Sequence, residues 1–223
     1  MKKLVVISLL LASQYARADL VVVEQSLESR QQPKTITIQT KDDKYRIDYG
    51  DKLSVIYNLA TGDSIRVDHS AATYTTLSGS QAVAMKNSMQ KAGIVPTGKP
   101  PRIVDTGKTE KINGYNAEVY TAETPSATYT FWVTKDYPNF DVVRQEMKKV
   151  QAASDALDQP GFLSLDLSKL DGLVIKSERL TGGGELMTLT LQSATIQPVA
   201  DAEFQPPVGY KDISLPAAAT PQR

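Results

Sequence analysis

The stretch from Arg102 to Asn139 constrains the fold of this chain more than any other part of the sequence. It places Asn113 and Gly114 between two extended runs, and both residue types tolerate the positive φ angles of a two-residue hairpin turn. Further along, Phe131 and Trp132 fall on opposite faces of an alternating strand, because successive side chains of a strand point to opposite sides. The stretch therefore predicts the middle of an antiparallel sheet.

Short alternating segments also fill the first part of the chain. Turn residues such as Gly50-Asp51 and Thr61-Gly62 separate them at intervals typical of an antiparallel meander. The predicted strands lie at residues 20–29, 35–40, 45–49, 53–57, 65–67 and 74–76.

The period changes at residues 78–91, where Ala82, Met85 and Met89 recur at a helical spacing. Their spacing predicts a helix with one apolar face. A second helix is predicted from Asn139, a good N-cap residue, to about Leu157.

The rest of the chain continues the sheet. Residues 162–170 are interpreted as a further short helical turn, and residues 173–180 and 185–192 as two more strands. The segment from Phe204 to Tyr210 is expected to pack aromatic groups onto the core.

The first eighteen residues are predicted to be a signal peptide. Lys2 and Lys3 precede a short apolar run, and Ala16 and Ala18 occupy the positions that signal peptidase reads. The apolar run is shorter than the roughly 20 residues that span a bilayer, so no integral membrane segment is expected after cleavage. The predicted location is the periplasm, with release from the cell as the alternative.

Three parts of the chain are therefore predicted: a signal peptide at residues 1–18, one β-rich domain at residues 19–212, and a disordered Pro/Ala-rich tail at residues 213–223. Cleavage after Ala18 removes three basic residues and no acidic one, leaving 22 basic against 25 acidic residues and a net charge of −3. A mildly acidic chain without a dense basic patch argues against a nucleic-acid partner.

The residue types of common catalytic sites are scarce. His69 is the only histidine and is interpreted as a turn residue. Ser88 and Lys91 match the Ser-x-x-Lys pattern of penicillin-recognising enzymes, but the partner motifs of that family are absent. Asp42-Asp43 lacks the repeated acidic loop that sets calcium geometry. The sequence predicts no enzyme, no metal site and no cofactor.

An apolar pocket between the sheet and the helices is the functional hypothesis that remains, with a plainly packed core as its alternative. The side chains predicted to line it are Tyr45, Ile47, Tyr57, Phe131, Trp132, Met85 and Met89.

The order of elements also resembles a known family. The segments "INGY" at residues 112–115, "WVTK" at 132–135 and "FQPPVGY" at 204–210 resemble an exported bacterial family of domains of unknown function, which is similar to the lipoprotein carriers LolA and LolB. The resemblance implies an α+β, mainly β fold: an antiparallel open half-barrel with two or three helices covering its concave face. It also implies a lipid, an acyl chain or a lipoprotein segment as the partner.

Two functions follow as hypotheses. The first is a soluble periplasmic binding protein that holds an apolar ligand or a lipoprotein segment in the half-barrel. The second is a non-catalytic structural or protein-interaction module of the cell envelope with a packed core, which presents a strand edge or its Pro-rich ends to a partner.

Overall fold

The structure is a computed structural model that describes residues 19–92, 101–156, 165 and 167–214. The predicted signal peptide at residues 1–18 lies outside the described residues, as do residues 162–164 of the predicted third helix. Of the predicted tail, residues 213 and 214 are described and residues 215–223 are not.

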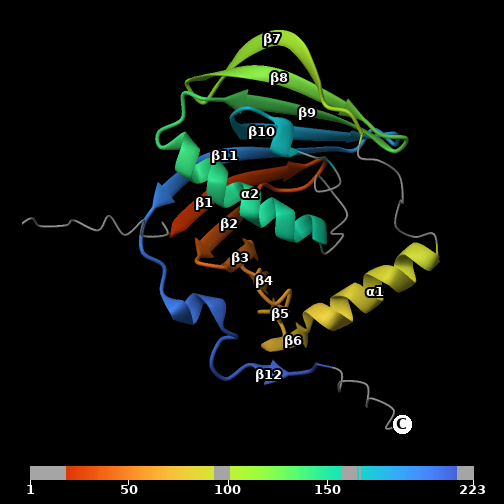
Figure 1. The fold of residues 1–223 in the computed structure, drawn as a ribbon, viewed down its shortest axis with the longest axis vertical. Coiled ribbons are helices and arrows are strands. Elements are labelled where there is room, and N and C mark those ends of the chain that lie inside the picture. Colours follow the sequence, from red (N-terminus) through yellow and green to blue (C-terminus); the bar gives the residue numbers. More distant parts are fainter. Residues whose placement is uncertain (1–18, 93–100, 157–164, 166, 215–223) are drawn as a thin grey trace, which may run out of the picture.

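Strands make up most of the described chain (Figure 1). Eight of them agree to within a few residues with the strands predicted at residues 20–76 and 173–192, whereas the strand at residues 211–212 was not predicted. The strands are β1 (Leu20–Glu28), β2 (Lys34–Lys41), β3 (Lys44–Tyr49), β4 (Leu53–Asn58), β5 (Ser64–Asp68), β6 (Thr73–Leu77), β7 (Val104–Ile112), β8 (Tyr115–Glu123), β9 (Ala127–Thr134), β10 (Leu173–Thr181), β11 (Leu186–Ile196) and β12 (Lys211–Asp212).

All of these strands form one open sheet in the order β12-β6-β5-β4-β3-β2-β1-β11-β10-β9-β8-β7. Each pairing is antiparallel except that of β12 with β6. The sheet thus consists of two meanders, β1–β6 and β7–β11, which the pairing of β1 with β11 joins. The prediction of a mainly β fold with an open antiparallel sheet is confirmed at this level.

The hairpin between β7 and β8 forms as the sequence predicts. Asn113 and Gly114 have φ angles of +48° and +91°, and Ile112 pairs directly with Tyr115 across the turn. Positive φ at both central residues gives a turn whose twist matches that of the two strands.

Two α-helices occur within the described residues, α1 (Gly79–Lys91) and α2 (Phe140–Ala156). Figure 1 shows α2 lying across the middle of the sheet, whereas α1 extends away from β6. Two short 3-10 helices follow, η2 (Leu167–Lys169) and η3 (Asp201–Phe204).

The side of the sheet that carries α2, called here the α2 face, holds the largest apolar cluster. Val143 and Val150 of α2 are buried there, at 1% and 6% exposure, together with Val22, Ile38 and Trp132 of the sheet. Burial of aliphatic side chains on this scale contributes roughly 1.5–3 kcal/mol for each residue.

The opposite face carries two smaller clusters. Phe131 packs there with Leu165 and Leu170, so the segment around η2 covers the β8–β10 part of that face. Phe204, from η3, packs against Ile56 and Val67 under the β3–β6 part. The prediction that the 204–210 segment packs aromatic groups onto the core is confirmed.

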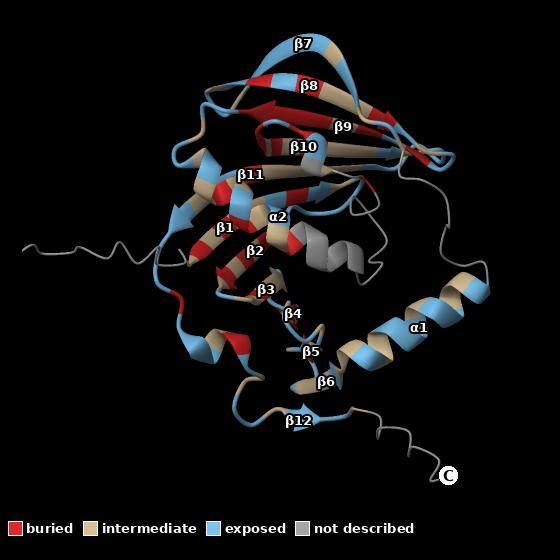
Figure 2. Cartoon of the chain, viewed as in Figure 1, coloured by how far each residue is buried: buried red, intermediate tan, exposed pale blue. Residues whose placement is uncertain are grey.

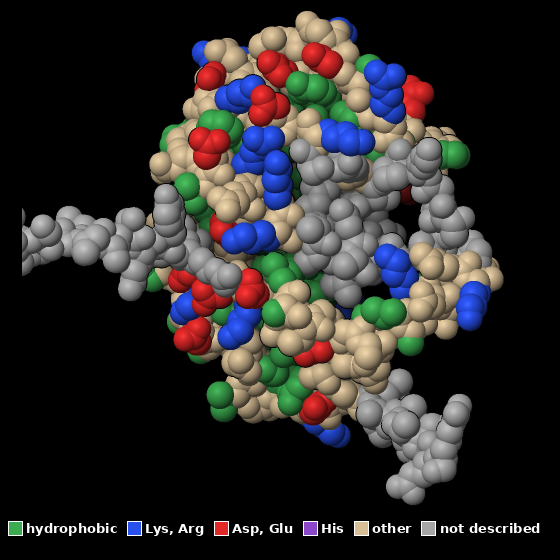
Figure 3. Space-filling view, viewed as in Figure 1, with side chains coloured by type: hydrophobic (Ala, Val, Ile, Leu, Met, Phe, Trp, Pro, Cys, Tyr) green, Lys and Arg blue, Asp and Glu red, His purple; other side chains and the backbone are tan. Residues whose placement is uncertain are grey.

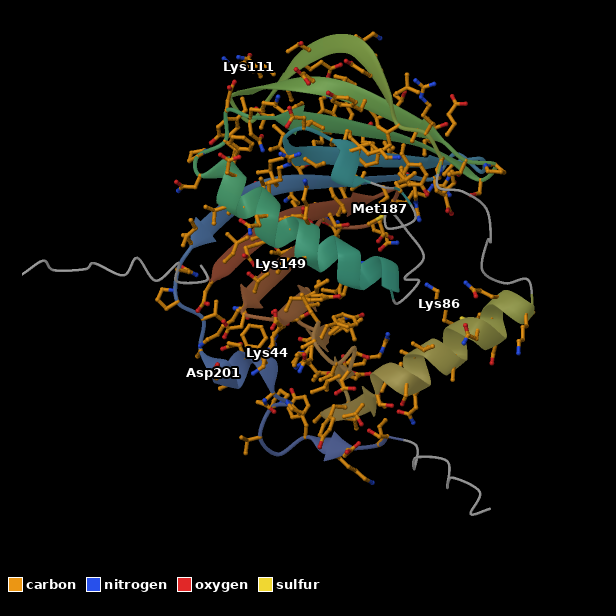
Figure 4. The ribbon with its side chains drawn as sticks, viewed as in Figure 1. Lys44, Lys86, Lys111, Lys149, Met187 and Asp201 are labelled. Carbon is orange, nitrogen blue, oxygen red and sulfur yellow. The ribbon has the colours of Figure 1, made fainter. Side chains whose placement is uncertain are left out.

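The segment around η3 lies beside β3, and Figure 4 shows Asp201 of η3 near Lys44 at the start of β3. Lys41 holds the same segment against the sheet. Its Nζ donates a hydrogen bond to Val199 O at 2.9 Å and forms an ion pair with Asp201 at 3.1 Å.

The prediction that both helices cover the sheet is wrong for α1. None of its residues is buried, and Figure 2 shows no buried position along it, in contrast to α2. Its stripe offers only Ala82 and two methionines, too little apolar area to hold a helix against the sheet.

Contacts at the first turn hold α1 in place. Ser78 and Gln81 form a reciprocal capping box, and Gly79 N donates to Asp63 Oδ1 at 2.9 Å. Gly79 also lies so close to the β4–β5 turn that a Cβ there would be 2.2 Å from Thr61 O. The helix is therefore attached to the sheet through its N-terminal turn.

We expect Gly79→Ala to loosen this attachment, because backbone atoms would have to move away from the new methyl group. Amide hydrogen exchange across α1 should accelerate about tenfold or more, while exchange in β1 and β11 stays unchanged. Gly182→Ala is the matched control, since a Cβ there meets nothing closer than 3.9 Å. Equal exchange in α1 for both variants would contradict the close approach.

Candidate ligand-binding groove

Three rows of side chains cross strands β1 to β6 on the α2 face, because antiparallel registers align every second residue. The first row is Glu24, Ile36, Tyr49, Leu53, Asp68 and Thr73; the middle row is Val22, Ile38, Ile47, Val55, Arg66 and Thr75; the third row is Leu20, Thr40, Tyr45, Tyr57, Ser64 and Leu77.

The α2 helix covers only one end of these rows. Val22 and Ile38 are buried in its cluster, whereas Ile47 and Val55 are half-buried and Tyr49 is 41% exposed. The apolar floor of the sheet thus continues beyond the part that α2 covers.

Beyond α2 the face forms a groove of about 600 Å³. Its floor comes from β3 to β6, one wall from Gln81 in the first turn of α1, and its outer end from Ile213, which follows β12. The lining residues are Tyr49, Leu53, Val55, Tyr57, Ser64, Arg66, Thr75, Thr76, Leu77, Gln81 and Ile213.

Tyr45 and Tyr57 mark the boundary between the covered and open parts. They are directly opposed across β3 and β4, and their rings stack with centroids 4.6 Å apart. Tyr45 is fully buried, while Tyr57 also lines the groove. The two sequence hypotheses, a packed core and an open pocket, each describe one part of this face.

Four of the predicted ligand-binding residues lie on the α2 face: Tyr45, Ile47, Tyr57 and Trp132. Only Tyr57 lines the groove. Ile47 is not a lining residue, although it pairs directly with Val55 of the groove floor. Tyr45 is enclosed by the core.

Trp132 is on the α2 face but is held by its own contacts. Its Nε1 donates to Glu110 Oε2 at 2.8 Å, and Lys176 Nζ lies 4.1 Å from the ring centroid. Phe131, fully buried, belongs to the opposite face, because adjacent residues of β9 point to opposite sides. Neither side chain reaches the groove.

The two predicted methionines of α1 do not contribute to the groove either. Met85 is 51% exposed and Met89 is half-buried, and neither is among the lining residues. The reason is the outward course of α1, which presents only Gln81 to the groove.

Sequence reasoning passed over Tyr49, Arg66 and Glu24. The period-two alternation of β3 already placed Tyr49 with Tyr45 and Ile47. Arg66 and Glu24 could be found only from the strand registers, since a polar residue in a short strand is otherwise assigned to the solvent side.

Glu24 is a carboxyl on the apolar α2 face. It follows a bulge in β1 and lies between Ile36 of β2 and Leu191 of β11, both buried. Burial raises its pKa to about 7, since removing a carboxylate from water disfavours its charged form. The pKa of Tyr49 is also raised, chiefly by desolvation and then by Glu24, while Arg66 opposes the shift.

The single histidine belongs to a polar cluster on the opposite face. Ser54, 1% exposed, donates to Asp48 and accepts from Arg46 Nη2 at 3.1 Å. Its one hydroxyl proton is thereby used, so His69 Nε2, at 2.6 Å, must donate to Ser54 Oγ. His69 Nδ1 then lies 3.1 Å from Tyr210 Oη.

This cluster connects the β3–β5 strands to the C-terminal segment. Arg46 Nη1 also bonds Glu203, to its backbone oxygen at 3.0 Å and its carboxylate at 3.2 Å. Ser54 is buried and already has three hydrogen-bond partners, so this cluster fixes the 203–210 segment to the sheet. We call it the clasp; it consists of Arg46, Asp48, Ser54, His69, Glu203 and Tyr210. The turn position predicted for His69, directly after β5, is correct.

Basic side chains gather over the region of α2 in Figure 3. Two of those on α2 are already paired: Lys149, labelled in Figure 4, bonds Glu146 at 2.6 Å, and Arg144 pairs with Asp171 at 3.4 Å. Within the described ranges, no three His, Cys, Asp or Glu side chains gather as metal ligands would. Neither of the described helices has the length and apolar character needed to cross a membrane.

Comparison with known proteins places the chain in a family. Residues 34–210 match the family described as Domain of unknown function (DUF4412). The chain belongs to the DUF4412 family. The match contains β2 to β11 and the clasp, and the predicted membership in a family of domains of unknown function is confirmed. No curated protein sequence matches the chain.

Solved structures give distant likenesses. Two crystal forms of the protein PNGF-II each align with 89% of this chain at 16% identity and a TM-score of 0.45, and the chain spans about a third of that protein, 31% and 32%. A LolA superfamily protein from Nitrosomonas europaea aligns with 84% of this chain and 89% of its own at 10% identity and a TM-score of 0.22.

Glu24 makes stability depend on pH in a defined direction. Its stabilising, protonated form is fully present below the unfolded pKa of 4.5, and its contribution is lost as the pH rises through about 7. We therefore expect Glu24→Gln to raise the free energy of unfolding relative to the parent by about 1–3 kcal/mol at pH 8 and little at pH 4. Glu123→Gln, at an exposed position, should give a difference that does not vary with pH.

The measurement is urea unfolding of the three proteins across this pH range. A stability difference between Glu24→Gln and the parent that stays constant from pH 4 to pH 8 would show that Glu24 is not desolvated.

The clasp predicts a second stability effect. Ser54→Ala leaves Asp48, Arg46 and His69 each short of a partner, so the free energy of unfolding should fall by about 1–3 kcal/mol. Ser70→Ala, exposed in the turn that follows, should change it by less than about 0.5 kcal/mol. Urea unfolding at pH 7 compares the two, and equal midpoints would contradict the hydrogen-bonded clasp.

Proposed function

We propose that this protein is an exported, non-catalytic binding protein that holds an apolar chain, such as the acyl chain of a lipid or lipoprotein, in the groove of the α2 face. The groove itself carries the proposal. It continues an apolar face that α2 covers only in part, so that Leu53, Val55 and Tyr57 line an open space rather than a packed interface.

The energetics favour an apolar ligand. Each CH₂ group transferred from water into the groove contributes about 0.8 kcal/mol. Tyr49 and Tyr57 add broad ring surfaces with a polar hydroxyl at one end, which suits a ligand that is apolar along its body and polar at its end. Pockets for small molecules usually combine such an apolar lining with a few polar groups.

The proposal includes the half-barrel interpretation and the compartment. The open sheet with α2 across one face supports the half-barrel interpretation, which comes from the resemblance to LolA and LolB. Export to the periplasm rests on the charged and apolar pattern of residues 1–18. The absence of catalysis is proposed because Ser54, the nucleophile type in contact with His69, is buried and its hydroxyl already donates to Asp48.

A second candidate, an envelope interaction module, draws on the edge of the sheet. β7 is the last strand of the sheet, and most of its residues are exposed, among them Lys108, Glu110 and Lys111. A free strand edge can pair with a strand of another protein. Charged side chains along an edge also prevent such pairing, so this observation favours the second candidate less strongly.

The direct test is to purify the chain from its native compartment without detergent, extract it with organic solvent and analyse the extract by mass spectrometry. A stoichiometric lipid or fatty acid is the expected result. A folded, monomeric protein that yields no lipid and binds no added acyl probe would favour the interaction module instead.

We expect Val55→Thr to weaken binding of a fluorescent acyl probe about fivefold, because a hydroxyl replaces one methyl group in the floor of the groove. Val104→Thr is the matched control: it makes the same exchange at a 48% exposed position of β7 and should leave the affinity unchanged. Equal affinities of the two variants in a fluorescence titration would place the acyl site elsewhere.

A further inference from the structure

Arg66 is the one charged side chain among the lining residues of the groove. It lies in the middle row, directly opposite Val55 on one side and Thr75 on the other. From Ile47 to Arg66 the row crosses three strands, a span of about 10 Å at the usual strand spacing. Along this row the side chains therefore change from the aliphatic Ile47 and Val55 to the guanidinium of Arg66.

No ion pair or hydrogen bond engages the Arg66 side chain within the described part of the chain. The other arginine on β3 to β6, Arg46, is the contrast, since Asp48, Ser54 and Glu203 bind it on the opposite face. Arg66 is an exposed residue, and the planar fork of its five N–H groups matches the geometry of a carboxylate. Arg66 keeps them available to the groove.

Two acidic residues, Asp68 and Glu24, lie in the same three rows as Arg66 and bear on the charge of any ligand. Asp68 is two residues from Arg66 on the same side of β5, but its Oδ1 accepts from the backbone N–H groups of Ser70 and Ala71 at 2.9 and 3.0 Å. Glu24 lies on β1, four strands from Arg66, under the apolar residues that raise its pKa. Neither acid is among the lining residues.

Neutral donors accompany the guanidinium. The hydroxyl groups of Ser64 on β5 itself, Thr75 on the neighbouring β6 and Tyr49 on β3 all line the groove. Tyr49 and Arg66 both line the groove, and the charge of Arg66 acts to lower the pKa of the Tyr49 phenol. A ligand head with several acceptor oxygens fits this surrounding of donors.

We propose that the groove selects a single-chain anionic amphiphile, a fatty-acid-like carboxylate whose head pairs with Arg66 and whose chain lies over Ile47, Val55 and Leu53. This inference rests on the proposed function, since it specifies the head group of the ligand for the same groove. Arg66 acts here as the residue that determines specificity, and burial of the chain supplies most of the affinity.

The test is calorimetric titration of the full chain at pH 8 with four probes below their aggregation concentrations: decanoate, decanol, decyltrimethylammonium and acetate. Decanoate should bind about tenfold more tightly than decanol, and acetate and the ammonium probe should bind more weakly than either. Arg66→Gln should remove the preference for decanoate while leaving decanol unchanged. Arg66→Lys should keep part of the preference, because charge remains and the planar fork is lost.

Arg30→Gln, in the turn between β1 and β2 and outside the groove, is the control and should behave as the parent. Equal binding of decanoate and decanol by the parent overturns the anionic preference but leaves the proposed function standing. If the ammonium probe binds most tightly, the anionic preference is also overturned, and Glu24 or Asp68 would be the residue that binds the head group. Acetate binding as tightly as decanoate would also overturn the inference, because the site would then recognise a free anion and not an amphiphile. Binding of none of the four probes overturns both this inference and the proposed function.

Discussion

The antiparallel pairing of β1 with β11 is the contact on which the rest of the structure depends. It runs the whole length of β1, from Leu20 opposite Ile196 to Glu28 opposite Met187. Without it the chain would have two separate meanders, and nothing would hold β1 and β2 of the first beneath α2, which belongs to the second. Since the two strands are far apart in the sequence, this pairing closes a long loop, and it places β1 and its row of side chains at the centre of one sheet.

The single sheet explains why a groove exists. Of the two described α-helices, only α2 returns across the sheet, and it packs over the central strands, where Val143 and Val150 fill the space above Val22 and Trp132. The other long connection, from β6 to β7, joins opposite ends of the sheet, and its helix α1 extends away from the body (Figure 1). As far as the described residues show, the floor formed by β3 to β6 therefore keeps apolar side chains uncovered, a surface that commonly marks a binding site.

Local signals predicted most of the elements and little of their assembly. The Asn113-Gly114 turn and the alternation through Trp132 are fixed by neighbouring residues, so the sequence was sufficient for them. The helix at 79–91 was also predicted correctly, but its helical spacing did not show that its apolar stripe was too thin to pack. Arg66 and Glu24 required the strand registers, which long-range pairing decides, and Phe131 was assigned to the pocket although its alternation with Trp132 had already placed the two on different faces.

Methyl NMR of the selectively labelled chain tests most directly whether an apolar chain occupies the groove beyond α2. Titration with decanoate should shift the methyl resonances of Leu53, Val55 and Leu77 and give intermolecular contacts to them, while Val143 and Val150 under α2 remain unperturbed. Contacts to Val143 and Val150, with no change at Val55, would contradict the account, because the ligand would then displace α2 instead of occupying the uncovered floor.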